Sequence, residues 1–319
     1  MNENIPYEER VLDVVFTGSY VEPMAKKQQI LASVEETMRP LVEKVLELII
    51  SNPNDTIETC VRKMLAFFQM EEQITEELFH QLVCGFMPVD AYARVYFRDK
   101  ILRAIVEAGI HVYIYGNGWE NFDLCHRPNF HMEMGDAYLA QKAVANAKIS
   151  LNVMPWFKAG FQERIASAML SGTIALTDSS EYIDNTFVNG EDLVLYSLKE
   201  IENIPNIIKD LLYDTERAKK IAHTGKMKAQ KEHMWFHRAE KIIALVKEFQ
   251  GVENIMENKQ EGKELELIGV KCDRTTVLAD CVVEIGKLRN RCWQIRKLAY
   301  FTFEDVYKIQ KETKKLSIC

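Results

Sequence analysis

Short apolar runs alternate with helix-like stretches along most of the chain, most clearly in its central part. Apolar and polar positions alternate over residues 149–153, which predicts a buried strand. Pro155 ends this strand, because proline has no N–H for a sheet ladder. Apolar positions at helical spacing predict a helix over residues 162–170, with Gly172 at its C-terminus and a second strand over residues 173–177. Strand, loop, helix and strand in this order are typical of the parallel crossover of an α/β fold.

The same pattern predicts further strands and helices on both sides of this unit. We expect strands at residues 12–17, 110–115 and 193–196, and helices at residues 89–108, 138–148, 201–213, 215–231 and 235–249. Helical periodicity over residues 24–88 predicts a helical insertion between the first strand and the helix that returns to the sheet. We therefore predict one α/β domain over residues 1–250 that contains this insertion.

The remaining residues, 251–319, differ in pattern from this domain. A polar stretch up to Gly262 is typical of a linker, and residues 278–299 carry apolar positions in steps of three and four. This heptad pattern predicts a helical tail that either forms a homodimer or packs on the α/β domain. We favour the homodimer, and an unchanged oligomeric state in a protein truncated after Gln250 would contradict it.

The loop between the two central strands is the first candidate for a binding site. Such loops lie at the carboxyl edge of a parallel sheet, where open α/β folds bind ligands. The following helix N-terminus favours an anion such as phosphate. Lys158, Gly160, Phe161 and Arg164 are the candidates here, and we expect Lys158 and Arg164 to converge on one pyrophosphate pocket. The alternative is an ordinary crossover with two surface cations.

Two glycine-containing turns follow predicted strands at the same edge. Glycine after a strand lets a ligand approach the backbone closely. The candidates for such contacts are Gly18 and Ser19 after the first strand, and Gly116, Asn117, Gly118 and Trp119 after the second. The alternative is that both are simple tight turns and that Trp119 packs in the core.

Polar residues near the end of the second central strand complete the candidate site. Ser180 and Glu181 follow this strand, and Glu181 is the best candidate for a carboxylate that binds a sugar or ribose hydroxyl. Either Ser179 or Ser180 is also well placed to cap a helix. Cys125, His126 and His131 lack a second ligand cluster, so we expect no metal site there.

Several of these segments resemble one enzyme family. Ser167-Ala168-Met169 followed by Ser171-Gly172-Thr173 resembles the "EAM.xGT" segment of group 1 glycosyltransferases, and residues 116–119 resemble the "vyGxgW" motif of their CgeB-like branch. The resemblance covers roughly residues 13–249 and implies the Rossmann-like donor-binding half of the two-domain GT-B fold. It also implies a nucleotide-sugar donor, no essential metal or other cofactor, and an arginine near the phosphates, which we assign to Arg98.

The sequence also departs from the common pattern of this family. Usual members carry two glutamates where this chain has Ala159 and Ser167, which puts the usual ribose contact in doubt. The CgeB-like branch often lacks that pair and has an arginine at the position of Arg164. Only about a dozen residues precede the first predicted strand, so we expect either a fragment of a longer enzyme or a protein without the acceptor-side domain, which a separate partner could supply.

Composition narrows the function classes without selecting one. The 319 residues include 47% hydrophobic and 27% charged positions, as in ordinary globular proteins, and the formal net charge of −7 argues against a general nucleic-acid binder. Apolar runs stay below membrane-spanning length and the N-terminus does not resemble a signal peptide. Seven scattered cysteines are typical of reduced thiols, so we expect a cytoplasmic protein.

Two hypotheses from different classes remain. The chain is either a glycosyltransferase domain that transfers a glycosyl group from a nucleotide sugar to an unknown acceptor, or a non-catalytic scaffold or partner subunit that retains the donor-domain fold. The cations and glycine turns favour the first hypothesis, and the missing carboxylates favour the second. A dehydrogenase fits poorly, because no GxGxxG motif follows the first strand.

Overall fold

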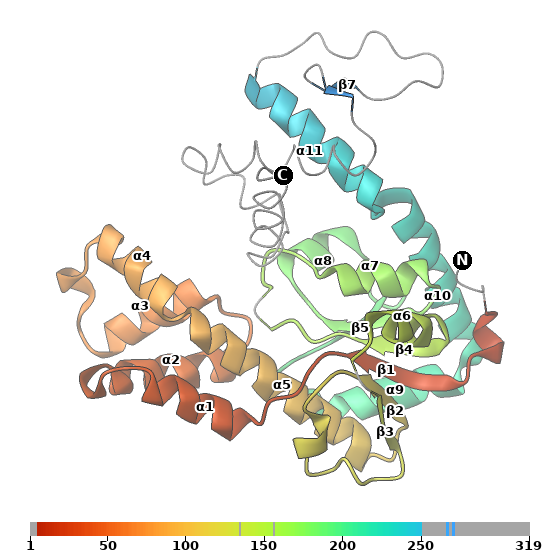
Figure 1. Cartoon of the computed structure of the whole chain (residues 1–319), viewed down its shortest axis with the longest axis horizontal. Helices are drawn as coiled ribbons and strands as arrows, with labels where there is room; N and C mark the ends of the chain where they lie inside the picture. Colours follow the sequence, from red (N-terminus) through yellow and green to blue (C-terminus); the bar gives the residue numbers. More distant parts are fainter. Residues whose placement is uncertain (1–4, 134, 156, 251–265, 268–269, 272–319) are drawn as a thin grey trace, which may run out of the picture. The chain divides into compact units, whose positions relative to one another are not determined.

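The computed structural model describes residues 5–133, 135–155, 157–250, 266–267 and 270–271. The chain forms two compact units, Met1–Lys231 and Glu232–Cys319. In the second unit, the described elements are the helix α11 (Trp235–Gln250) and the strand pair β7 (Glu266–Leu267) and β8 (Val270–Lys271) (Figure 1). The predicted linker and the heptad segment 278–299 lie outside the described residues.

The first unit is built on one parallel sheet of six strands in the order β3-β2-β1-β4-β5-β6. The strands are β1 (Leu12–Thr17), β2 (Val112–Tyr115), β3 (Phe130–Glu133), β4 (Ala147–Leu151), β5 (Ile174–Asp178) and β6 (Val194–Tyr196). This is the doubly wound, Rossmann-like strand order, in which the direction of winding reverses between β1 and β4. The predicted α/β fold with a Rossmann-like parallel sheet is confirmed.

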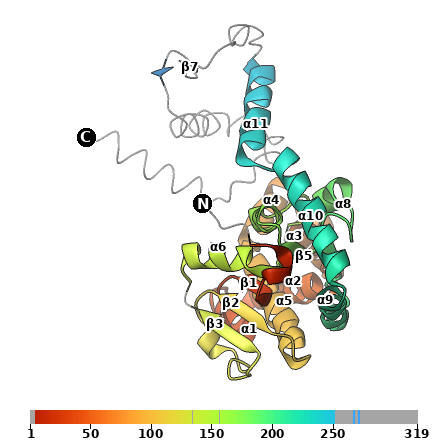
Figure 2. The same cartoon turned by 90° about the vertical axis from the view of Figure 1, so that its right-hand side faces the viewer.

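The helices of the first unit either cover the two faces of this sheet or form the insertion before α5. They are α1 (Pro23–Ala32), α2 (Arg39–Ser51), α3 (Ile57–Phe67), α4 (Glu76–Gly85), α5 (Met87–Glu107), α6 (Ala137–Ala145), α7 (Glu163–Leu170), α8 (Glu181–Thr186), α9 (Ile204–Tyr213) and α10 (Thr215–Glu232). Helices α5 and α9 lie together (Figures 1 and 2), and their apolar side chains share a core with Val14 and Phe16 of β1. The intervening Val15 points to the opposite face, where it packs with Ala143 of α6.

The helical insertion lies between β1 and α5, as predicted. Thr56 and Thr75 cap α3 and α4, because their hydroxyl oxygens accept the N–H groups of Thr59 at 3.1 Å and Leu78 at 3.2 Å. The apolar faces of α1 to α4 pack into the same hydrophobic core as α5 and the sheet. The insertion is therefore an integral part of the first unit.

Two details of the sheet differ from the sequence prediction. Strand β3 was not expected, because it is only four residues long and lies in a mixed polar stretch. The helix predicted over residues 138–148 ends earlier, at Ala145, since Ala147 and Lys148 belong to β4. Ala147 pairs with Leu12 of β1, so the sheet ladder overrides the helical periodicity at this point.

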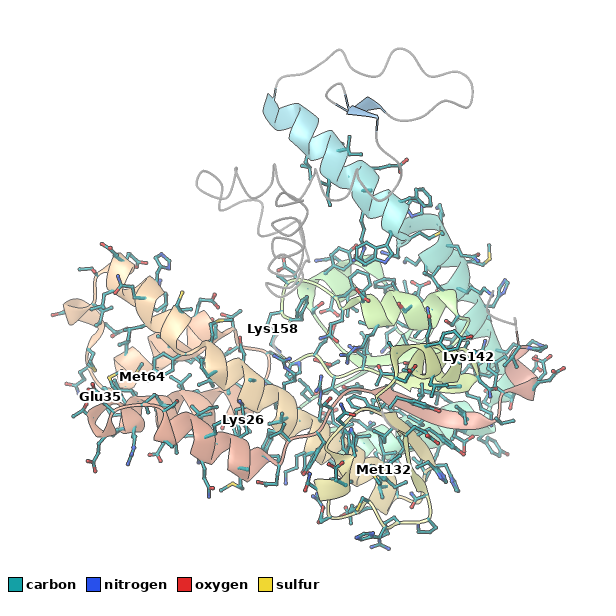
Figure 3. All side chains as sticks on the ribbon, viewed as in Figure 1. Lys26, Glu35, Met64, Met132, Lys142 and Lys158 are labelled. Atoms are coloured by element: carbon teal, nitrogen blue, oxygen red, sulfur yellow. The ribbon has the colours of Figure 1, made fainter. Side chains whose placement is uncertain are left out.

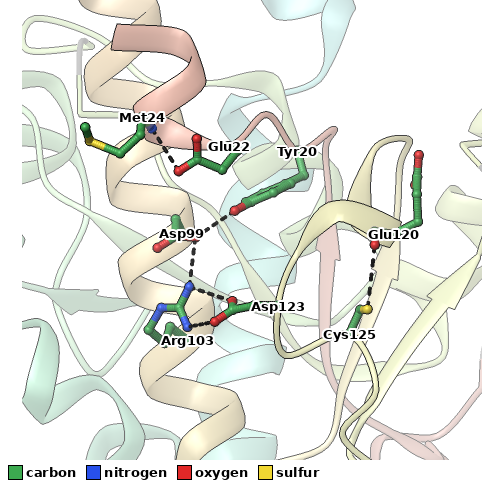
Figure 4. Close-up of polar contacts among 8 residues, drawn as sticks. All are labelled: Tyr20, Glu22, Met24, Asp99, Arg103, Glu120, Asp123 and Cys125. Carbon is green, nitrogen blue, oxygen red and sulfur yellow. Dashed lines mark hydrogen bonds and ion pairs between the residues drawn. The ribbon is translucent and has the colours of Figure 1, made fainter. Parts of the chain in front are cut away.

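A polar network fixes the loop after β1 against α5 (Figure 4). The Tyr20 hydroxyl donates to Asp99 Oδ1 at 2.9 Å, and Arg103 Nη2 donates to the same oxygen at 3.3 Å. Arg103 also donates to both carboxylate oxygens of Asp123, at 2.9 and 2.7 Å. The network holds the loop that leaves β1 beside the middle of α5, where Arg98 is located.

Candidate anion-binding site

The candidate site lies where the winding of the sheet reverses, at the carboxyl ends of β1 and β4. Open α/β sheets bind ligands at this place because the two loops there diverge to opposite faces. The chain leaves β1 through Gly18 and Ser19, and the loop after β4 leads to the N-terminus of α7, which carries Arg164. Helix α5 adds Arg94 and Arg98 to the same region.

Arg98 and Arg164 come together at the end of β1. Arg164 Nη1 donates to the carbonyl oxygen of Thr17 at 2.8 Å, and Arg98 Nη1 donates to that of Ser19 at 3.2 Å. A Cβ atom added to Gly18 would lie 3.5 Å from Arg98 Cζ, so this glycine leaves room beside the guanidinium. Arg98 is buried, so its guanidinium lies inside the molecule beside the end of β1.

The electrostatics of these side chains are unusual. Only 8% of Arg98 is exposed, and burial, together with the charges of Arg164 and Arg94, lowers its pKa to about 9. Burial and Arg94 also lower the pKa of Arg164, against the opposing effect of Glu163. Within the described part of the chain, no carboxylate lies within 4 Å of Arg98 or Arg164. We call Arg94, Arg98 and Arg164 the arginine cluster, and its concentrated positive charge favours an anionic ligand.

Lys158 belongs to a neighbouring group of charges. Lys158 is labelled in Figure 3, and its ammonium donates to the carbonyl oxygen of Pro53 in the turn between α2 and α3. It also lies near the carboxylates of Asp178, Asp90 and Asp55. Burial is the main effect on this lysine and lowers its pKa. The structure thus brings Arg164 together with Arg98, whereas it joins Lys158 to the helical insertion.

The glycines of the second turn bring two backbone segments into close contact. A Cβ atom on Gly116 would lie 2.1 Å from the carbonyl oxygen of Gly18. Gly118 has a φ of 87°, and a Cβ atom there would lie 2.4 Å from the carbonyl oxygen of Tyr20. Both positions therefore require glycine for packing between the loops after β1 and β2. Direct contact of these two glycines with a ligand stays a prediction.

Asn117 and Trp119 strengthen this loop-to-loop contact. Trp119 is 1% exposed, and its Nε1 donates to the carbonyl oxygen of Gly18 at 2.7 Å. The Asn117 carbonyl oxygen accepts the N–H of Tyr20 at 2.9 Å, and its side-chain oxygen accepts the N–H of Gly135 at 3.3 Å. These contacts fix the loop after β1, which is next to the carbonyl oxygens that accept hydrogen bonds from Arg98 and Arg164.

The remaining predicted residues connect the loop after β4 to α8. The Ser180 hydroxyl donates to the carbonyl oxygen of Gly160 and accepts the N–H of Ile183 at 3.3 Å, so it caps α8 as one of the two interpretations expected. Phe161 is buried and stacks on Tyr182 at 5.1 Å. The Glu181 side chain is exposed, while its N–H donates to the Lys158 carbonyl oxygen at 2.8 Å.

A buried carboxylate beneath the loop was not identified from the sequence. Asp178 Oδ1 accepts the N–H of Met154 at 2.7 Å, and the Tyr196 hydroxyl, which donates to the Asn152 carbonyl oxygen at 2.6 Å, lies 3.4 Å from the same carboxylate oxygen. Burial raises the pKa of Asp178 to about 6, although Lys158 acts in the opposite direction. Its second oxygen, Oδ2, is buried without a hydrogen-bond partner. The sequence feature that could have identified it is an aspartate at the last position of a predicted apolar strand.

Other classes of site find no support in the described residues. These residues contain no group of three or more histidine, cysteine, aspartate or glutamate side chains that could hold a metal ion. His131 lies against His111, with 3.0 Å between Nε2 and Nδ1. Among the helices the structure describes, each is too short or too polar to cross a membrane.

Comparison with solved structures gives distant similarities. A sucrose-phosphate synthase from Thermosynechococcus elongatus shares 15% identity at a TM-score of 0.41 and covers 49% of this chain and 43% of its own. Anabaena HepE, in complex with UDP and glucose, shares 13% identity at a TM-score of 0.40, with 74% and 48% covered. A pneumococcal O-GlcNAc transferase, GtfA, in complex with UDP and GlcNAc, shares 14% identity at a TM-score of 0.38, with 48% and 33% covered. In these three comparisons the match covers less than half of the other chain.

Comparison with sequences gives one family. No curated protein sequence matches the chain. A family model described as "Glycosyl transferase-like" matches residues 97–244. This segment begins immediately before Arg98 and includes the loop after β4 and Arg164. The part of the chain that builds most of the candidate site is therefore similar in sequence to this family.

Proposed function

We propose that the chain binds the diphosphate of a nucleotide-activated sugar at the arginine cluster and takes part in transfer of the glycosyl group to an acceptor. The observation that carries this proposal is the pair of the buried Arg98 and the half-buried Arg164, two cations without a carboxylate within 4 Å among the described residues, at the reversal point of the sheet. The glycosyl transferase-like match over the same segment supports the donor class.

The arginine cluster suits the chemistry of glycosyl transfer. When the bond between the sugar and the diphosphate breaks, negative charge grows on the leaving phosphate oxygen. Guanidinium groups fixed in a region of low dielectric stabilise such charge without having to reorganise. Arg164 and Arg98 are held by backbone carbonyl oxygens, so their positions are set before a ligand binds. This preorganisation lowers the barrier to departure of the nucleoside diphosphate.

The CgeB-like branch is part of the same proposal. Its support is the arginine at position 164, combined with Ala159 and Ser167 in place of the two glutamates of the larger family. Without the second glutamate, the ribose needs another partner. Glu181 is exposed and begins α8 just after β5, and it is the residue we assign to a sugar or ribose hydroxyl.

Binding of nucleotides to single-site variants tests the proposal. We expect one of UDP, GDP or CDP to bind wild-type protein in isothermal titration calorimetry. Arg98→Gln and Arg164→Gln each remove a charged donor to phosphate, which typically costs about 1.5–3 kcal/mol, and should weaken affinity about 10- to 100-fold. Lys100→Gln is the matched control, because Lys100 is an exposed cation on the same helix.

The outcomes separate the proposal from its competitor. Binding that is lost in both arginine variants and kept in the lysine control supports it. If wild-type protein binds none of the three nucleotides at millimolar concentration, the donor site does not exist. In that case the chain acts as a non-catalytic subunit that retains the fold.

A further inference from the structure

The loop between β4 and α7 leaves the sheet where side chains take over the hydrogen bonds of the ladder. The Asn152 N–H still continues the ladder, because it donates to the Leu176 carbonyl oxygen of β5 at 2.8 Å. The Asn152 carbonyl oxygen, however, accepts the hydroxyl of Tyr196 at 2.6 Å, and the Met154 N–H donates to Asp178 Oδ1 at 2.7 Å. These two side chains therefore satisfy the backbone groups at the point where the chain turns out of the sheet.

Tyr196 reaches this loop from the far side of β5. It is the last residue of β6 and pairs with Asp178 in the register of the sheet, so its side chain passes the end of β5 to reach Asn152. Tyr196 is 5% exposed, and its hydroxyl lies 3.4 Å from Asp178 Oδ1. Closely packed side chains in a protein interior hold one position, so this hydroxyl is a fixed attachment point for the loop.

The other end of the loop is held by the segment that follows β5. The Glu181 N–H donates to the Lys158 carbonyl oxygen at 2.8 Å, and the Ser180 hydroxyl donates to the Gly160 carbonyl oxygen. Helix α7 then begins at Glu163. The loop is thus attached at both ends to β5, β6 and α8 before the chain enters α7.

The position of this loop sets the position of the first turn of α7. Arg164 is the second residue of α7, and its Nη1 donates to the Thr17 carbonyl oxygen at 2.8 Å. Because α7 follows the loop directly, a displaced loop would displace this guanidinium together with the N–H groups of the helix N-terminus. A loop that is fixed in advance spares a ligand the entropic cost of ordering it.

We propose that Tyr196 is a positioning residue of the donor site, whose hydroxyl holds the loop after β4 in the geometry that places Arg164 against the diphosphate. This inference rests on the proposed function, because it takes the arginine cluster as the diphosphate site. Tyr196 acts through the Asn152 carbonyl oxygen and not by contact with the ligand. Asp178 supports the same loop from β5 through the Met154 N–H.

Removal of the Tyr196 hydroxyl alone tests this role. Tyr196→Phe keeps the buried ring and leaves the Asn152 carbonyl oxygen without its donor. In calorimetric titration of UDP, GDP and CDP, we expect it to weaken binding of the nucleotide that wild-type protein prefers about 10-fold, because the ligand must then order the loop.

Tyr7→Phe is the matched control. Tyr7 is similarly buried, at 8% exposed, and its hydroxyl has no hydrogen-bond partner among the described residues. Loss of this hydroxyl removes no contact with the loop after β4, so the Kd should stay within about twofold of the wild-type value. The control shows whether any buried tyrosine hydroxyl affects nucleotide binding.

A double-variant cycle with Arg164 gives a readout that a merely structural role would not change. If Tyr196 acts by positioning Arg164, the hydroxyl has little left to position once the guanidinium is gone. Tyr196→Phe combined with Arg164→Gln should therefore bind within about twofold of Arg164→Gln alone. A hydroxyl that only stabilises the fold would lower the Tm and leave the Kd unchanged, or give losses of affinity that multiply.

Hydrogen exchange of the Met154 amide, followed by NMR spectroscopy, reports on the same loop. In wild-type protein this amide should exchange slowly without nucleotide and change little when nucleotide is added, because its hydrogen bond to Asp178 already exists. In Tyr196→Phe it should exchange faster in the free protein and slow down on addition of nucleotide. That difference is the signature of a loop ordered by its ligand.

The outcomes separate this inference from the proposed function. Weaker binding in Tyr196→Phe, unchanged binding in Tyr7→Phe and the expected coupling to Arg164 support the positioning role. Equal affinity of Tyr196→Phe and wild type, losses that multiply in the cycle, or fast Met154 exchange in free wild-type protein overturns it and leaves the donor site intact. If Tyr196→Phe does not fold, the exchange in wild-type protein decides. Absence of nucleotide binding to wild-type protein removes the proposed function and the positioning role with it.

Discussion

Arg98 and Arg164 place positive charge where burial opposes it, as the lowered pKa of each shows. Arg98 is buried and Arg164 is half-buried, and their hydrogen bonds go to backbone carbonyl oxygens instead of carboxylates. A buried cation without a charged partner destabilises the fold, and such strain is usually found where function requires it. At the scale of single residues, the cluster is the strongest indication of a phosphate-binding function.

Asp178 predicts a pH dependence of stability with a definite sign. Its folded-state pKa of about 6 lies above the ordinary value of 3.8, so folding takes up a proton in this range and stability falls as pH rises through 6. Asp178→Asn removes this penalty while it keeps an acceptor for the Met154 N–H. The difference in unfolding free energy between variant and wild type should grow by about 2 kcal/mol from pH 4 to pH 7.5 in urea titrations.

Asp123→Asn provides a contrast of opposite sign. Hydrogen bonds from Arg103 lower the pKa of Asp123, so its contribution to stability is present at neutral pH and is lost as pH falls through the folded-state pKa. This variant should therefore be destabilised relative to wild type at pH 7.5, and less so once the pH is brought well below 3.8. A difference for Asp178→Asn that stays constant with pH would contradict the account of its burial.

At the scale of elements, the loops after β1 and β2 pack directly against each other, because glycine at two positions of the second loop leaves no Cβ atom between them. The turn after β2 packs on the turn after β1 so closely that a Cβ atom on Gly116 would overlap the Gly18 carbonyl oxygen. Trp119 then donates a hydrogen bond to that same oxygen. The loop after β1, which carries the acceptors for Arg98 and Arg164, therefore owes its position to the loop after β2.

Glycine substitutions test this contact. Gly116→Ala should destabilise the protein by several kcal/mol, because the added carbon would lie 2.1 Å from a backbone oxygen that cannot move freely. Gly85→Ala is the control: nothing lies within 4 Å of its added Cβ, and alanine favours the helix α4. Thermal unfolding should show a lower Tm for the first variant and an equal or higher Tm for the second. Equal Tm values for Gly116→Ala and wild type would contradict the close approach.

The sequence was informative about elements and less so about side-chain partners. The run at residues 12–17 predicted β1 with its observed bounds, and the central crossover was predicted to within one or two residues, because apolar periodicity reports local burial. The sequence pattern could not show that Lys158 would contact the Pro53 carbonyl oxygen, 105 residues away, or that Arg98 would lie near Arg164. Those contacts depend on how the helical insertion packs, which no local pattern encodes.

At the scale of the whole first unit, Lys158 connects the helical insertion to the sheet. Its ammonium contacts the turn between α2 and α3, while its backbone belongs to the loop after β4 and accepts the Glu181 N–H. The same ammonium lies near Asp90 and Asp178, two acids with raised pKa values. The insertion and the candidate site are therefore coupled through one side chain.

Lys158→Met should loosen this connection without removing much apolar volume. Loss of the charged donor to Pro53 should lower stability by about 1–3 kcal/mol and speed hydrogen exchange in the turn between α2 and α3, for example at the Asp55 amide, which donates to Asn52. Lys63→Met, which removes an exposed partner of Asp55, is the control and should change stability little. Unchanged exchange in Lys158→Met would contradict the coupling.

The most direct measurement for the account as a whole is calorimetric titration of the nucleoside diphosphates into wild-type protein, Arg98→Gln and Arg164→Gln at fixed pH and salt. The account predicts saturable binding of one nucleotide to the wild type and an affinity loss of about 10- to 100-fold in each variant. Equal affinity in all three proteins, or no binding to the wild type, would contradict a diphosphate site at the arginine cluster.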